Sequence, residues 1–96
     1  MTMDSNAVNA RIEELVYTIQ FTLDLGDNAR VAFVAEGIET QRGFRRSAGE
    51  YSEAIASALA RGRLSPRALA IGRHPESDML NWIARLGERL TKGSAT

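Results

Sequence analysis

The chain has 96 residues, of which 44% are hydrophobic and 25% are charged, and its formal net charge is zero. This length fits one domain, and this composition excludes a globally disordered chain. The absence of cysteine excludes disulfides and any thiolate-based metal site or nucleophile, and no apolar run reaches the ~18 residues that span a membrane.

The start of the sequence is polar and lacks the basic and then apolar order of a signal peptide. Together with the absence of cysteine, this favours a cytoplasmic location. We expect residues 1–9 to form a flexible tail, residues 10–93 to form a single α+β domain, and residues 94–96 to fray.

The first predicted element is a β-strand from Leu15 to Leu25. Within it, Tyr17, Ile19 and Phe21 alternate with polar residues, which is typical of a strand with one solvated face. A helical register competes with this strand, through Ile12, Leu15, Val16, Ile19 and Leu23. We prefer the strand because segment 16–22 is rich in β-branched and aromatic residues, which are poor helix formers.

A second strand is expected after a turn at Gly26-Asp27-Asn28, which makes the pair a β-hairpin. This strand runs from about Ala29 to Ala35, and Gly37 is typical of a bulge or bend. The alternating segment 38–44 is either a bent continuation or a third strand, and the missing turn before it favours the continuation.

Three helices are expected in the second half. Ser47 and Glu50 fit a capping box that begins a helix ending near Ala60, before Gly62. Ser65-Pro66 begins a short helix to about Ile71, because proline suits the first helical position. His74-Pro75-Glu76 begins the last helix, whose apolar residues recur at three-to-four spacing to about Thr91.

Because strands precede helices, we expect an α+β fold in which a hairpin of two, or three, antiparallel strands packs against the helix that begins at Ser47. A sheet this small is marginal alone. Its free edge could therefore pair with a second copy of the chain and form a homodimer.

The sequence contains few residues or motifs that are typical of catalytic sites. The single histidine, His74, directly precedes a proline, and we interpret it as an exposed turn or cap residue. There is no Gly-x-Ser-x-Gly nucleophile elbow, no Gly-x-Gly-x-x-Gly and no Gly-Lys-Ser/Thr sequence. We therefore predict a non-enzymatic chain without a cofactor.

With no cysteine and one histidine, only a site built from carboxylates could bind a metal ion. The candidates are Glu13-Glu14 and the set Asp24, Asp27 and Asn28, which lacks the spacing of a calcium loop. Since turns favour Asp and Asn in any case, we interpret the set as structural and predict no metal site.

An uneven distribution of charge is the best functional lead. Residues 1–41 carry seven acidic residues and two arginines, whereas residues 42–73 carry two glutamates and seven arginines. These are Arg42, Arg45, Arg46, Arg61, Arg63, Arg67 and Arg73. The asymmetry indicates an interaction surface, unless the two halves neutralise each other in the fold. The arginines lie at opposite ends of a predicted helix, about 20 Å apart, so they need not form one patch.

Two functions remain open. The first is a protein-binding regulator, inhibitor or adaptor that docks through these arginines, with Trp82 as an anchor or, alternatively, as a core residue. Small proteins that mobile elements use against host machinery have this profile.

The second function is nucleic-acid binding through Arg42–Arg73, with segment 64–90 arranged as in a helix-turn-helix. The sequence pI near 6.6 opposes it. So do Glu76 and Asp78, which would repel phosphates from the start of the second helix.

Overall fold

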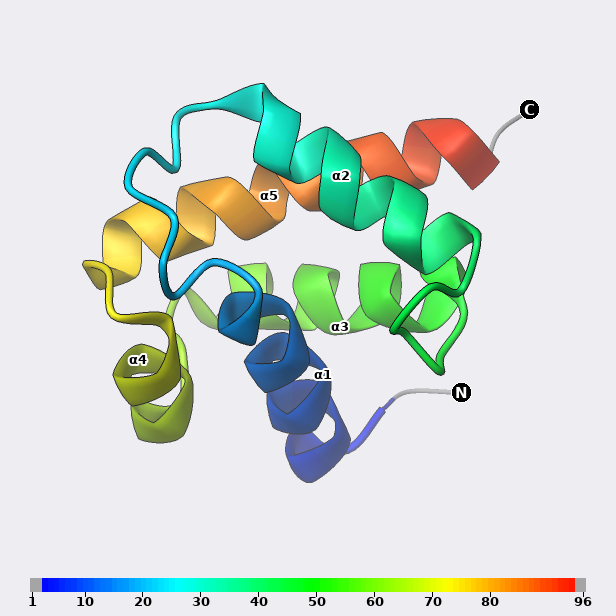
Figure 1. Cartoon of the computed structure of the whole chain (residues 1–96). Helices are drawn as coiled ribbons and strands as arrows, with labels where there is room; N and C mark the ends of the chain where they lie inside the picture. Colours follow the sequence, from blue (N-terminus) through cyan, green and yellow to red (C-terminus); the bar gives the residue numbers. More distant parts are fainter. Residues whose placement is uncertain (1–2, 95–96) are drawn as a thin grey trace.

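The computed structural model describes residues 3–94, and within this range the chain is all-helical (Figure 1). Its helices are α1 (Ser5–Tyr17), α2 (Asn28–Glu39), α3 (Ala48–Arg61), α4 (Pro66–Gly72) and α5 (Glu76–Ser94). The predicted α+β fold with a β-hairpin is therefore wrong. Homodimerisation through an edge strand loses its basis as well, because residues 3–94 contain no strand.

Helix α1 follows the register that competed with the first predicted strand only as far as Val16, because it ends at Tyr17 and leaves Ile19 and Leu23 in the following loop. Its N-cap is Asp4, whose Oδ1 accepts a hydrogen bond from the backbone N–H of Ala7 at 2.7 Å. Its buried residues recur every three to four positions and are Val8, Ile12, Leu15 and Val16. The weak helix formers of segment 16–22 lie mostly beyond the helix, because α1 ends at Tyr17 and residues 18–21 form turns. Residues 5–9, predicted as tail, form the start of the helix.

Helix α2 replaces the second predicted strand. Asp27, expected in a hairpin turn, is instead the N-cap and accepts from the N–H of Ala29 at 2.9 Å. The buried residues again have helical spacing and are Val31, Val34, Ala35 and Ile38. Gly37 lies within the helix, where a Cβ atom would come 3.1 Å from the Phe44 ring. Its role is thus close packing, and segment 38–44 is a helix end and loop, not a third strand.

The three helices of the second half are confirmed. Ser47 Oγ caps α3 by accepting from the N–H of Glu50 at 3.2 Å, and Gly62 ends it with a positive φ of 71°. Ser65 caps α4 with Pro66 at its start. Helix α5 begins at Glu76 and extends to Ser94, beyond the predicted end.

The helices enclose one core. Helix α5 packs against α2 and α3, while α1 packs against α3 and α4 (Figure 1). The largest buried side chains include Trp82, Tyr51 and Leu86, and no charged residue of the described chain is buried there. At the α3–α5 contact, a Cβ on Gly87 would lie 3.0 Å from Ile55 Cγ2, so glycine permits this approach. Between residues 3 and 94, no helix has the length and apolar character needed to cross a membrane.

Candidate functional site

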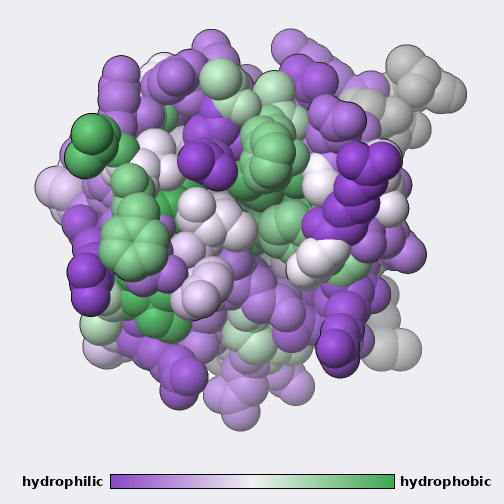
Figure 2. All heavy atoms as spheres, viewed as in Figure 1, coloured by the Kyte–Doolittle hydropathy of each residue, from purple (hydrophilic) through white to green (hydrophobic). Residues whose placement is uncertain are grey.

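Four large apolar side chains are exposed on α1, α2 and the loop that connects these helices. The exposed fraction is 64% for Tyr17, 78% for Phe21, 101% for Leu23 and 69% for Phe33. We call these four residues the docking face. In the space-filling view, hydrophobic side chains reach the surface over the α1–α2 loop and over α2 (Figure 2).

The docking face is large for an exposed apolar surface. With about 150–200 Å² for each side chain, the four expose on the order of 500 Å². The largest apolar patch on a typical monomer measures ~300–600 Å² and often marks an interaction site. The exposed area therefore falls within the range of these largest patches.

The α1–α2 loop is held at both ends. On α5, Arg85 donates hydrogen bonds to the Leu25 carbonyl, to the Gly26 carbonyl at 3.3 Å and to Asn28 Oδ1 at 2.7 Å. At the other end, His74 Nε2 lies 2.9 Å from the Ile19 carbonyl oxygen. Since a carbonyl only accepts, this nitrogen carries the hydrogen.

These two attachments orient the loop so that Leu25 is buried while Phe21 and Leu23 point outward. His74 occupies the predicted turn before α5. It is half-buried rather than exposed, however, and acts as a tether for the loop.

Two arginines stack on the docking face. The guanidinium carbon of Arg73 lies 5.7 Å from the ring centre of Phe21, and that of Arg30 lies 5.5 Å from the ring centre of Phe33. These are cation–π distances. Neither guanidinium forms an ion pair with a carboxylate in the described part of the chain.

Three hollows lie next to one another along the docking face, because each shares two lining residues with the next. A hollow of about 630 Å³ lies between α1, α3 and α4 and includes Thr18 and Phe44 in its lining. The same two residues line a smaller hollow of about 200 Å³, which also contains Arg30 and Phe33. Arg30 and Phe33 in turn line a third hollow, of about 640 Å³, beside the α1–α2 loop.

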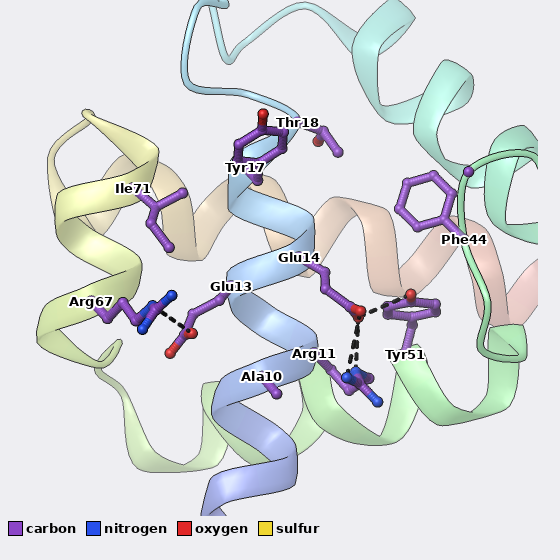
Figure 3. Close-up of a pocket in the computed structure, with 11 residues that line it drawn as sticks. Ala10, Arg11, Glu13, Glu14, Tyr17, Thr18, Phe44, Tyr51, Arg67 and Ile71 are labelled. Atoms are coloured by element: carbon purple, nitrogen blue, oxygen red, sulfur yellow. Dashed lines mark hydrogen bonds and ion pairs between the residues drawn. The ribbon is translucent and has the colours of Figure 1, made fainter.

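A network of charged and phenolic groups lies in the first hollow (Figure 3). Arg11 Nε is 2.8 Å from Glu14 Oε2, and Arg11 Nη1 is 3.0 Å from Glu50 Oε2. The Tyr51 hydroxyl donates to Glu14 Oε2 at 3.0 Å. Burial alone would lower the pKa of Arg11, but its hydrogen bond to Glu50 and the charges of both glutamates outweigh burial and raise it. The network ties α1 to α3.

The two adjacent glutamates of α1 serve different partners. Glu13 Oε1 is 3.3 Å from Arg67 Nε, and its other oxygen accepts from Ser65 Oγ at 3.3 Å. Glu13 therefore points toward α4, whereas Glu14 points toward Tyr51 on α3 (Figure 3). Among residues 3–94, no group of three or more His, Cys, Asp or Glu side chains could hold a metal ion.

The structure disperses the predicted arginines. All seven are exposed: Arg42, Arg45, Arg46, Arg61, Arg63, Arg67 and Arg73. Arg46 pairs with Glu50 at 3.7 Å, and Arg61 donates to Asn9 Oδ1 at 3.0 Å. Of the seven, Arg42 lines the small hollow beside Phe33, Arg67 lines the first hollow, and Arg73 lies over the Phe21 ring.

Trp82 lies in the core with no exposed surface, which is the alternative that the sequence left open. Sequence reasoning also missed the docking face and Arg85. The available signal was Phe33, an apolar residue that falls outside the helical spacing of the buried residues of α2.

Comparison with protein families, curated proteins and solved structures found no match for this chain.

The Tyr51 hydroxyl leads to a prediction about alkaline stability. Burial, followed by the hydrogen bond to Glu14 and its charge, raises the Tyr51 pKa from 10.0 to about 12. The unfolded chain thus releases this proton at lower pH than the folded chain. We expect stability to be complete below pH 10 and to fall as the pH rises from 10 toward 12. Urea denaturation followed by circular dichroism on either side of pH 10 measures this fall.

The control is Tyr51→Phe, which has no proton to release and should lose less stability over the same pH interval. Equal losses in the wild type and the variant would show that Tyr51 is not the group responsible.

Proposed function

We propose that this chain is a non-enzymatic protein-binding module, a regulator, inhibitor or adaptor, that docks through Tyr17, Phe21, Leu23 and Phe33. The observation that carries the proposal is the exposure of all four side chains, each by about two thirds or more. Covering such side chains is the main favourable term in protein association. The proposed docking surface is therefore mainly aromatic and differs from the arginine-rich segment predicted from the sequence.

The composition and rigidity of the docking face support this function. Aromatic and arginine side chains dominate the hot spots of protein interfaces, and Arg30 and Arg73 stack on Phe33 and Phe21. Because Arg85 and His74 hold the loop, less conformational entropy is lost on binding. We also propose a cytoplasmic location, which the lack of cysteine favours.

Nucleic-acid binding is the less supported function. Helices α4 and α5 do form within segment 64–90. However, Arg46, Arg61 and Arg67 already contact Glu50, Asn9 and Glu13. These contacts leave fewer of the predicted arginines free for phosphates.

A capture experiment with a matched control tests the proposed function. The tagged chain is incubated with lysate of the organism that encodes it, beside the double variant F21S/F33S and the control Leu59→Ser. Leu59 is an exposed leucine on α3, outside the docking face. We expect F21S/F33S to lose its partners and L59S to keep them. The loss of one hot spot weakens binding by about 30-fold.

An unchanged set of retained proteins in F21S/F33S would remove the docking face as the binding surface. Titration with duplex and single-stranded nucleic acid tests the other function, since binding that falls steeply with salt would favour it.

A further inference from the structure

Leu23 has the form of a knob. It is the most exposed large apolar side chain of the described chain, at 101%, and it lies near the middle of the α1–α2 loop. The backbone on either side of it is attached through the Ile19 carbonyl to His74 and through the Leu25 carbonyl to Arg85. Leu23 therefore projects from a loop that is held in place, and its side chain packs against no other residue of the described range 3–94.

The small hollow on the same surface has the form of a socket. It measures about 200 Å³ and lies between Phe33 on α2 and Phe44 in the α2–α3 loop, with Arg30 and Arg42 in its lining. Gly37 contributes to its wall, and a Cβ there would come within 3.1 Å of the Phe44 ring. The hollow accommodates one apolar side chain of moderate size.

The charges around the docking face have both signs. Arg30 and Arg73 lie over its rings, while Asp24 and Asp27 line the same hollow as Phe21 and Arg30. Each aspartate uses Oδ1 for a backbone hydrogen bond within the loop or helix start, so its other oxygen can accept from a partner. A partner of uniform charge would meet repulsion from one of the two sets. A second copy, by contrast, offers aspartates to the arginines of the first copy and arginines to its aspartates.

The area also agrees with a second copy. Two docking faces of on the order of 500 Å² each would bury about 1,000 Å² of apolar surface, which reaches the lower limit of a specific interface before the polar rim is counted. The formal net charge of the chain is zero, so no overall repulsion opposes association.

We infer that the docking face binds a second copy of this chain, with Leu23 of each protomer inserted between Phe33 and Phe44 of the other. The inference rests on the proposed function, because it names an occupant of the same surface. The two-fold arrangement closes the assembly at a dimer, since both knobs and both sockets are used.

Sedimentation of the full chain over a series of concentrations tests the inference. The wild type should sediment as a dimer, and Leu23→Asp should dissociate at least about 30 times more readily, as expected for loss of a buried anchor. Leu59→Asp places the same charge on an exposed leucine of α3 and should behave as the wild type. Circular dichroism confirms that each variant retains its helices.

A mixing experiment separates the knob-and-socket contact from general stickiness. Thr40 is exposed and lines the socket, so Thr40→Trp should fill the socket without entering the core. Neither L23D nor T40W should dimerise alone. In an equimolar mixture, the intact Leu23 of T40W can enter the intact socket of L23D, and one of the two contacts returns. The mixture should therefore contain dimer where each separate variant does not.

A wild type that stays monomeric throughout the series would overturn the inference, as would an L23D variant that dimerises like the wild type. Failure of the proposed function can be distinguished from failure of the dimer inference. If the wild type is monomeric but F21S/F33S loses lysate partners, the docking face binds other proteins only. If the wild type dimerises but no lysate partner depends on the docking face, only self-association remains.

Discussion

Replacing Trp82 with alanine is expected to lower the free energy of unfolding by about 3–5 kcal/mol. Trp82 has no exposed surface and lies on α5, the helix that packs against both α2 and α3. Truncation removes its transfer free energy and leaves a cavity where three helices meet. A domain of this size has a total stability of about 5–15 kcal/mol, so the variant should be close to unfolding. Urea denaturation measures the change.

Trp82→Phe is the companion variant and should cost much less. The Trp82 Nε1 is buried and has no hydrogen-bond partner among the residues that the structure describes. Such an unpaired donor costs about 1–3 kcal/mol, and phenylalanine removes it while keeping most of the apolar volume. If W82F were as stable as the wild type but lost its binding partners, Trp82 would contribute directly to the interface, contrary to its position in the core.

Replacing Gly72 with alanine is expected to cost about 1–3 kcal/mol, the usual penalty for overpacking. Gly72 is buried at the end of α4, where a Cβ atom would overlap Met79 Sδ and lie 3.4 Å from Val16 Cβ. Met79 is flexible but completely buried, so it has no solvent to move into. The new methyl group would therefore push α4 away from both α1 and α5. Thermal or urea unfolding detects the loss.

Gly49→Ala provides the matched control, because it adds the same methyl group to a helix. At Gly49, the nearest atom to a new Cβ is Ser47 Oγ, at 3.9 Å. Alanine is the better helix former, so this variant should be neutral or more stable by up to about 1 kcal/mol. Similar losses in G72A and G49A would mean that close packing at Gly72 is not the cause.

The errors in the first half of the chain have a common physical source. Tyr17, Phe21, Leu23 and Phe33 are apolar but exposed, and they supplied much of the period-two pattern that predicted strands. Sequence reasoning assumes that apolar residues are buried. Where a surface is apolar, that assumption assigns the wrong residues to the core and the wrong period to the segment.

Turn chemistry was also ambiguous. Asp27 suits a hairpin turn and a helix N-cap equally well, because in both its side chain accepts a hydrogen bond from a nearby backbone N–H. Only the presence of α5, against which Val31, Val34 and Ile38 pack, decides between them.

The candidate site could be predicted only in part. Seven arginines were predicted to bind a partner, and one of them, Arg73, lies over Phe21 of the docking face. However, the pairing of Arg61 with Asn9 and of Arg67 with Glu13 depends on contacts across more than fifty residues. No local pattern in the sequence predicts contacts between residues so far apart.

Local chemistry in the sequence alone determined the helices of the second half, because Ser47 and Ser65 cap helices through hydrogen bonds made within three residues. The absence of thiol chemistry was equally plain from composition. Tertiary structure decided the rest. Helices α1 and α2 form because their apolar stripes are buried against α3, α4 and α5. Which apolar residues remain outside, as Leu23 does, depends on the whole packing arrangement, since burial is a property of the folded chain and not of the residue.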